Sequence, residues 1–424
     1  MDGHWGKVKS ITVREIKKMG HSNMKRRDFL GKAALGVVST GIGLPLLGNS
    51  TFAASQPHKI TYRTLGRTGL KIPLVSFGVM NSDSPDLLNQ ALDMGVMHLD
   101  TAHLYLRGNS ERVIGEVLEQ RGDRDKIYIG TKMRLARDRE KGVFSLEGTD
   151  REPPATEENL FKQLEISLKR LRTDYVDILY LHSLYTTKMV TYEPLMNALV
   201  KVKKQGKARF IGTSTHHDEP NIIRATVDAE IYDVVLTAYN YVQEHKEEVK
   251  KAIAYAAKNG VGVVAMKTQG GRRLQQDSEF EIDHKAALKW VLEDENVCTT
   301  IPGITTFDQL DTDFSVMNAP ILSRAERISL EQAANLQGKI YCQNCRSCIP
   351  SCPNRVEIPN LMRAYMYAKA YGNLSQARST IAEVPPNKGL DMCQKCPSCS
   401  ADCQTGINIG RRVLSLLGEE LYRV

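Results

Sequence analysis

The sequence predicts an α/β protein, with a closed (β/α)8 barrel followed by a small α-helical domain rich in cysteine. Eight short apolar or β-branched runs alternate with eight longer segments of helical period between residues 74 and 318. Eight of the nine cysteines follow that region, in two copies of one tight spacing. We therefore expect three parts: an N-terminal extension with an export signal at 1–53, the barrel at 59–320 and the cysteine-rich domain at 321–424.

Residues 24–55 have the layout of an export signal. A basic start with the pair Arg26-Arg27 precedes a weakly hydrophobic stretch and a small-residue site that ends at Ala53. This pattern is typical of twin-arginine signals. We expect a periplasmic or extracytoplasmic location, cleavage after Ala53, and translation from Met24. The alternative is a disordered basic tail with a chance arginine pair.

The composition excludes little by itself, since 42% hydrophobic and 25% charged residues are ordinary for a globular protein. The net charge of +8 is spread along the chain among 49 acidic residues, so it does not favour nucleic-acid binding. No apolar run reaches the roughly 18 to 20 residues of a membrane-spanning helix. We expect no integral membrane span.

Eight strand-helix units in about 250 residues are the size of a TIM barrel. An open, doubly wound sheet is the alternative, but no G-x-G-x-x-G turn follows the first strand. The third helix carries an expected apolar stripe of Leu160, Leu164, Ile166, Leu168 and Leu171. Strands are predicted at 74–80, 97–102, 127–133, 176–182, 208–215, 234–240, 262–268 and 299–304. Helices are predicted at 84–95, 110–121, 156–171, 191–206, 220–230, 245–260, 283–294 and 306–318.

Reactive residues of such a barrel belong at the C-terminal ends of its strands. Asp100, Lys132 and His182 end the second, third and fourth predicted strands, and Tyr105 lies five residues after Asp100. Tyr105 would donate a proton to a carbonyl oxygen, with its pKa lowered by Lys132, and His182 would orient that oxygen. Taken singly, Asp100 or Lys132 is as readily a helix cap or a solvated charge as a catalytic residue, and His182 is as readily a core histidine. Their combination favours catalysis.

Four segments resemble the aldo-keto reductases: YRTLGRTGLKIPLVSFG (62–78), HLDTAHLY (98–105), GNSERVIGEVL (108–118) and SLKRLRTDYVDILYLH (167–182). The resemblance covers about 62–320. It implies an oxidoreductase acting on a small carbonyl or alcohol substrate, with Asp100, Tyr105, Lys132 and His182 as its catalytic residues.

The resemblance also implies a nicotinamide cofactor, NADP or NAD, extended over the barrel mouth. The family places charged partners of the 2′-phosphate after strand eight, where this chain has Gly303, Ile304 and Gln309. A charged hydrogen bond is worth about 1.5–3 kcal/mol, so NADP preference stays open. Thr215 stands where the family has Asn, and Met266 where an aromatic ring is frequent. The residues expected to bind the cofactor are Asp100, Ser214, Thr215, Met266 and Gly303.

Two runs of cysteine share the spacing C-x2-C-x2-C-x3-C, which is typical of two [4Fe-4S] clusters. In two-cluster ferredoxins the fourth cysteine of each run ligates the other cluster. Zinc knuckles and disulfides are the alternatives. The intervening 357–384 segment has a helical pattern, so the domain resembles an α-helical ferredoxin, and Cys298 is expected in the barrel core. The expected sets are Cys342, Cys345, Cys348 and Cys403, and Cys352, Cys393, Cys396 and Cys399.

Three functions fit these features. In the first, the tetrad converts a carbonyl or alcohol while the clusters relay electrons to an unidentified electron-transfer partner. In the second, the barrel is a docking scaffold of an electron-transfer protein. In the third, a plain NAD(P)H-dependent reductase carries structural clusters. The loop from Arg134 to about Ala155 is long enough to cover the mouth or to dock another segment, and a flexible surface insertion is its alternative.

Overall fold

A computed structural model describes residues 60–270, 282–337, 341–419 and 421, so the predicted export signal lies outside the described part. Eight parallel strands form one sheet in the order β12-β11-β10-β9-β8-β5-β4-β3. Val75 and Gly78 pair in parallel with Thr300 and Gly303, which joins the first strand to the eighth and closes the barrel. All eight predicted strands are confirmed. They are β3 (Phe77–Gly78), β4 (His98–Asp100), β5 (Tyr128–Met133), β8 (Val176–Leu184), β9 (Ala208–Thr215), β10 (Val234–Ala238), β11 (Gly262–Met266) and β12 (Thr299–Thr300).

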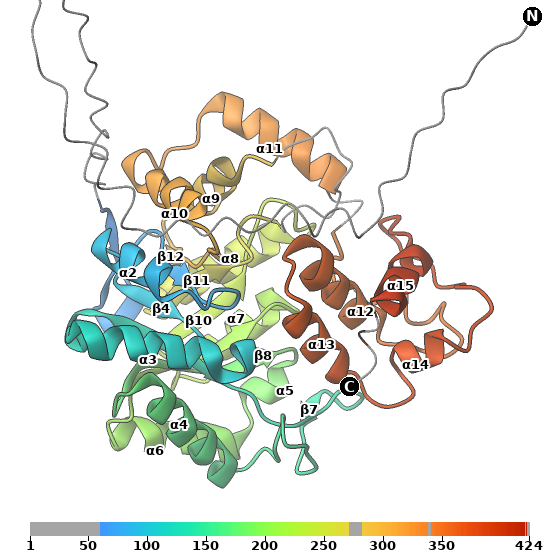
Figure 1. Cartoon of the computed structure of the whole chain (residues 1–424), viewed down its shortest axis with the longest axis horizontal. Helices are drawn as coiled ribbons and strands as arrows, with labels where there is room; N and C mark the ends of the chain where they lie inside the picture. Colours follow the sequence, from blue (N-terminus) through green and yellow to red (C-terminus); the bar gives the residue numbers. More distant parts are fainter. Residues whose placement is uncertain (1–59, 271–281, 338–340, 420, 422–424) are drawn as a thin grey trace, which may run out of the picture. The chain divides into compact units, whose positions relative to one another are not determined.

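Helices surround the strands as predicted (Figure 1). In the third of them, Leu160, Leu164 and Leu168 face the core, but Ile166 is 39% exposed. The prediction for Ile166 was wrong because two residues turn a helix by about 200°, which puts Ile166 opposite Leu164. The barrel helices are α2 (Pro85–Asp93), α3 (Asn109–Arg121), α4 (Glu157–Leu171), α6 (Glu193–Lys204), α7 (Glu219–Asp228), α8 (Lys246–Lys258), α9 (His284–Leu292) and α10 (Phe307–Phe314). Shorter elements are η1 (Gly66–Thr68), η2 (Tyr105–Gly108), η3 (Arg124–Lys126), α5 (Thr187–Val190) and η4 (Ser315–Asn318).

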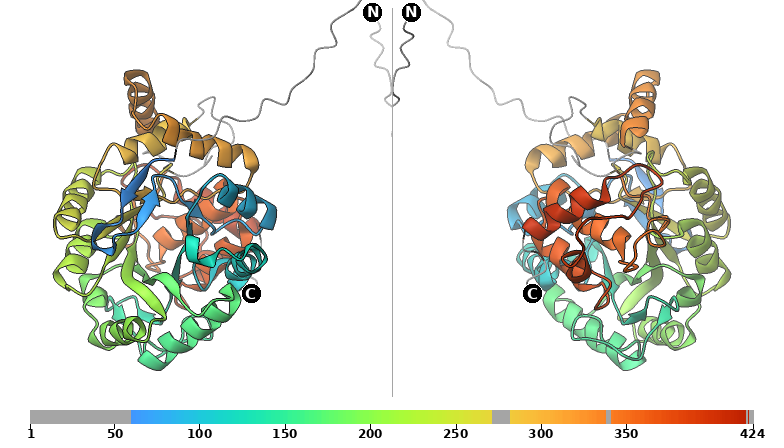
Figure 2. Two further views of the ribbon diagram at one scale, coloured as in Figure 1. Left: turned by 90° about the vertical axis from the view of Figure 1, so that its left-hand side faces the viewer. Right: turned by 90° about the vertical axis from the view of Figure 1, so that its right-hand side faces the viewer.

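The N-terminal end of the barrel is closed by a hairpin that the sequence analysis does not predict, β1 (Tyr62–Thr64) and β2 (Lys71–Pro73). Its buried side chains Leu65, Leu70 and Ile72 join the apolar interior of the strands. The turn approaches β11 so closely that a Cβ on Gly66 would lie 2.4 Å from the Gly262 nitrogen. Figure 2 shows the hairpin across this end in its left view and the C-terminal helices across the ring in its right view.

The chain after the barrel falls into two pieces. Helix α11 (Arg324–Gln337) lies in the segment predicted as the cysteine-rich domain, yet it packs on α9, where Lys289 pairs with Glu326 at 2.6 Å. The following helices have an apolar core of their own, which contains Cys348 and Cys352. Among the described residues, no helix is both long and apolar enough to cross a membrane. The helices that follow α11 are α12 (Ile358–Tyr365), the π-helix η5 (Met366–Ala370), α13 (Leu374–Ala382), α14 (Leu390–Cys393) and α15 (Ile409–Gly418). The first three of them confirm the helical prediction for 357–384.

Candidate active site

The four predicted catalytic residues meet at the C-terminal end of the barrel. Asp100 ends β4, Lys132 lies in β5, His182 in β8, and Tyr105 begins η2. The Lys132 ammonium donates to a carboxylate oxygen of Asp100 and, at 2.7 Å, to the backbone oxygen of Thr101. Tyr105 and His182 face each other edge to face, with ring centroids 5.8 Å apart. The strand order thus gathers residues that are 82 positions apart at most, as the sequence predicts.

Burial sets the protonation of this tetrad. Burial lowers the pKa of Lys132 and raises that of Asp100, while each partner opposes the shift of the other. Burial also raises the pKa of Tyr105 well above its usual value, and the Asp100 carboxylate adds to that rise. The expectation that Lys132 brings the pKa of Tyr105 toward neutrality is therefore wrong, because burial has the largest effect on this pKa and Asp100 shifts it in the same direction. Tyr105 keeps its proton at neutral pH and can donate it.

The imidazole of His182 is neutral at neutral pH. Burial and the nearby charges of Arg134 and Lys132 lower its pKa well below the usual value. Its Nδ1 atom has no hydrogen-bond partner among the described residues. A neutral imidazole beside a protonated tyrosine can hold a carbonyl or alcohol oxygen between two polar groups.

The tetrad lines a cavity of about 110 Å³. Ser214, Met266 and Gly303, three of the predicted cofactor contacts, line it as well. The Ser214 hydroxyl accepts the backbone N–H of Ser183 at 2.8 Å. Thr215 is not part of the cavity wall, since it is buried and its hydroxyl bonds to the carbonyl oxygens of Leu184 and His217.

The C-terminal helices supply the opposite wall of this cavity, which the sequence analysis does not foresee. Asn373, which caps α13, bonds to Asn81 beside Gly303, where the 2′-phosphate of NADP was expected. Only the length of the loop after Lys132 hinted that another segment docks here. The wall residues from these helices are Arg363, Tyr367, Tyr371, Gln376, Thr380 and Glu383.

The cavity over the tetrad is small for a nicotinamide dinucleotide. Pockets for drug-sized ligands have volumes of about 300–1,000 Å³, whereas the cavity over the tetrad holds about 110 Å³. The place expected for the 2′-phosphate is covered by the contact of Asn81 with Asn373. The nicotinamide contacts predicted for Ser214, Met266 and Gly303 therefore stay a prediction.

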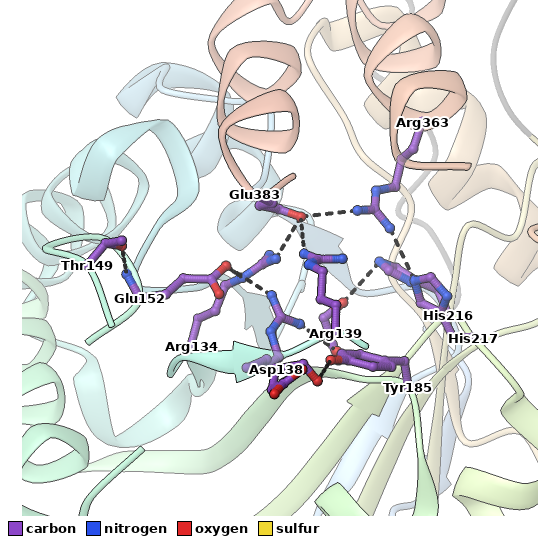
Figure 3. A network of polar contacts seen from close by, with 12 residues as sticks. Arg134, Asp138, Arg139, Thr149, Glu152, Tyr185, His216, His217, Arg363 and Glu383 are labelled. Atoms are coloured by element: carbon purple, nitrogen blue, oxygen red, sulfur yellow. Dashed lines mark hydrogen bonds and ion pairs between the residues drawn. The ribbon is translucent and has the colours of Figure 1, made fainter. Parts of the chain in front are cut away.

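The loop after Lys132 docks on the C-terminal helices (Figure 3). It forms a short hairpin of β6 (Arg137–Asp138) and β7 (Val143–Phe144). Glu383, just after α13, accepts from Arg134 at 2.7 Å, Arg363 at 3.1 Å and Arg139 at 3.4 Å. This contact favours a docking role for the loop over a flexible insertion. We call the set Arg134, Arg137, Arg139, Arg363, Glu152 and Glu383 the arginine cluster.

Charge is concentrated in the arginine cluster because four guanidinium groups share two carboxylates. Glu152 accepts from Arg134 at 2.7 Å and from Arg137 at 3.0 Å. Burial opposes ionisation of Glu152, but the charges of Arg137 and Arg134 outweigh it and hold the pKa at about 2. Burial lowers the pKa of Arg137 to about 10, and Arg134 adds to this effect. The arginine cluster is thus a network of ion pairs that joins the loop after Lys132 to the C-terminal helices.

The eight C-terminal cysteines lie in two groups of four. Cys342, Cys345, Cys348 and Cys403 line one small cavity, and we call them the first set. Burial raises the pKa of Cys393 to about 12, and the neighbouring thiols of Cys352, Cys399 and Cys396 add to that rise. These four form the second set. All eight thiols are free, and Cys298 is buried in the barrel interior as predicted.

The first set lies against the barrel. Cys342 lines a small cavity together with His216 and Lys267, which also line the cavity over the tetrad. The next residue, Gln343, donates to the Val242 carbonyl oxygen at 3.3 Å.

Among the described residues, no group of three or more His, Cys, Asp or Glu side chains is arranged to hold a single metal ion.

Comparison with known proteins agrees with this geometry. Residues 77–287 match the profile described as the aldo/keto reductase family. An Alternaria alternata protein called aldo-keto reductase AMT2 is 29% identical over 51% of this chain and 66% of its own length. L-galactose dehydrogenase of Arabidopsis thaliana is 26% identical over 66% of this chain and 97% of its own. A Schizosaccharomyces pombe protein called aldo-keto reductase yakc [NADP(+)] is 32% identical over 40% and 49%.

Solved structures show the same fold. The aldo-keto reductase AKR11C1 from Bacillus halodurans superposes with a TM-score of 0.53 at 23% identity, covering 65% of this chain and 96% of that one. The thermostable aldo-keto reductase Tm1743 superposes with a TM-score of 0.51 at 24% identity, covering 64% and 99%. These likenesses confirm the (β/α)8 fold.

Proposed function

We propose that this protein oxidises or reduces a small alcohol or carbonyl substrate and that iron-sulfur clusters relay the electrons. The proposal starts from the match of residues 77–287 to the aldo/keto reductase family, whose members are oxidoreductases. One observation carries the proposal. The helices that bring the eight cysteines together also form a wall of the cavity over the tetrad. A cluster-bearing segment in this position connects the reacting carbon with an electron-transfer partner.

The residues of the barrel would orient the substrate and move its proton. Tyr105, protonated at neutral pH, donates its proton to the substrate oxygen during reduction and recovers it during oxidation. His182 holds the same oxygen as a neutral partner. Lys132, tied to Asp100, places a positive charge 4.9 Å from the Tyr105 ring centroid and favours the anion that forms as the proton leaves.

The thiols fit two [4Fe-4S] clusters. Each set supplies four cysteines, and each draws one of them from the other sequence run, as in two-cluster ferredoxins. The two clusters, which carry one electron each, would together take up the two electrons that leave when an alcohol becomes a carbonyl and releases two protons. The first set, next to His216 and Lys267, would be the one that exchanges electrons with the barrel.

Export of the folded protein completes the proposal. Iron-sulfur clusters are assembled in the cytoplasm, and a twin-arginine signal at 24–55 would carry the finished protein to the periplasm. A relay to an external carrier would free the enzyme from nicotinamide, which is consistent with the small cavity over the tetrad.

The test is an anaerobic purification of the full chain, iron and sulfide analysis, and visible absorbance during addition of NADPH, NADH or a chemical reductant. We expect about eight irons per chain, bleaching by the chemical reductant, and no bleaching by either nucleotide. Fewer than four irons would overturn the clusters. Rapid bleaching by NADPH would instead favour a nicotinamide-dependent reductase, as in relatives whose names include NADP(+).

A further inference from the structure

Lys267 is a charged residue of the cavity wall to which the proposed function assigns no role. It directly follows β11, at the end of the barrel where the tetrad lies, and its φ of +57° is in the left-handed region. Such a backbone is uncommon for a residue with a side chain, and strained residues of this kind cluster at functional sites. Its ammonium lies 3.4 Å from the Tyr367 hydroxyl, and no carboxylate among the described residues pairs with it.

The cavity carries an excess of positive charge. Four cationic side chains line it, Lys132, Arg134, Lys267 and Arg363, against two carboxylates. Asp100 is engaged by Lys132, and Glu383 is shared by three arginines of the arginine cluster. Lys267 is half-buried and has no carboxylate partner among the described residues, so a bound anion would supply its missing counter-charge.

The cavity volume limits the size of that anion. A cavity of about 150 Å³ holds benzene, which has about six non-hydrogen atoms, so one of about 110 Å³ limits the ligand to at most about this size. A hydroxy acid or oxo acid of three carbons has this size. A nucleotide phosphate with its sugar and base is much larger.

We propose that the substrate is a small hydroxy acid or oxo acid whose carboxylate binds Lys267 and Arg363 while its hydroxyl or carbonyl oxygen lies between Tyr105 and His182. This inference rests on the proposed oxidoreductase function and names its substrate class. Lys267 and Arg363 bind and orient the carboxylate, and they take no part in proton transfer. Tyr367 holds the Lys267 ammonium at the wall through its hydroxyl.

The experiment is isothermal titration of the anaerobically purified full chain with lactate and with propane-1,2-diol, which has the same carbons and no carboxylate. We expect lactate to bind and the diol to bind at least about tenfold more weakly, as one charged hydrogen bond implies. Lys267→Met should weaken lactate binding by about 10- to 100-fold, while Lys267→Arg should retain most of it. Lys250→Met removes an exposed lysine from α8 and should change nothing.

Four outcomes would overturn the inference: equal affinity for lactate and the diol, unchanged lactate affinity in Lys267→Met, equal losses in Lys267→Arg and Lys267→Met, or turnover of neutral alcohols alone. The last would leave the proposed oxidoreductase intact. Lactate binding without turnover of any acid or neutral alcohol would leave the binding site intact and contradict the proposed function. Inorganic pyrophosphate serves as a probe for the phosphate groups of a nucleotide, which would be another anion for this site. If it binds through Lys267 more tightly than lactate does, the site belongs to a nucleotide and the inference fails.

Discussion

The two ends of the barrel are both covered, but by opposite kinds of chemistry. At the N-terminal end, Leu65, Leu70 and Ile72 of the hairpin fill the space between the strands. At the C-terminal end, the cover includes the arginine cluster, in which Glu383 accepts from three guanidinium groups. Apolar burial is non-directional and does not depend on protonation, whereas buried ion pairs depend on geometry and on every partner. Both covers contribute to stability, but only the ionic cover lies at the end where the tetrad is found.

The largest effect is expected from the reacting end. Tyr105→Phe removes the proton donor and should lower kcat/KM by about 10²–10⁴, with little change in stability. The matched control is Tyr180→Phe, because Tyr180 is buried in the barrel interior and its hydroxyl has no partner among the described residues. Steady-state kinetics with any acid that the protein converts will compare the two. Equal rates in Tyr105→Phe and the unmodified chain would contradict the assigned role.

The next effect concerns the ionic cover. Glu383→Gln leaves Arg134, Arg139 and Arg363 without their shared carboxylate and should destabilise the protein by about 3–5 kcal/mol, as loss of one partner of a buried ion pair does. Glu419→Gln is the control, since Glu419 pairs with Lys369 near the surface and such pairs contribute at most about 1 kcal/mol. Denaturant unfolding measures both. Equal losses of unfolding free energy in Glu383→Gln and Glu419→Gln would contradict the expected difference between the buried cluster and the surface pair.

The smallest effect on catalysis is expected at the apolar end. Ile72→Ala should cost about 2–5 kcal/mol of unfolding free energy because it removes buried methyl and methylene groups and leaves a cavity. The rate of the folded fraction should stay the same, since Ile72 is in the hairpin at the far end from the tetrad. Leu146→Ala changes a 67% exposed side chain and should have little effect. A large loss of kcat in Ile72→Ala would show that the two ends are coupled.

Much of the fold was predictable because its signals are local. Strands of the barrel such as 176–182 are short apolar runs with helices between them, and all eight were found. The hairpin at 62–73 was missed since its strands have three residues each, too few for an alternating pattern. Ile166 was misplaced because hydrophobicity was counted without regard to the angle between positions.

The site was predicted only in part. Asp100, Lys132 and His182 could be placed because the ends of parallel strands meet at one edge. The wall residues Tyr367 and Glu383 could not, because they come from separate helices whose docking depends on side-chain contacts across about 250 positions. The pKa of Tyr105 was misjudged for a similar reason, since burial is a property of the folded chain and has the largest effect on this pKa.

The grouping of the thiols has a consequence for how the C-terminal segment matures. The first set takes Cys403 from the far end of the segment, and the second takes Cys352 from the near end. A chain that stops before Cys403 leaves the first set with three thiols, and a piece that starts after Cys352 leaves the second with three. Neither half of the segment can therefore be completed alone. Synthesis has to reach Cys399 before the second set is whole and Cys403 before the first set is, and one cleavage between the two runs separates ligands of both.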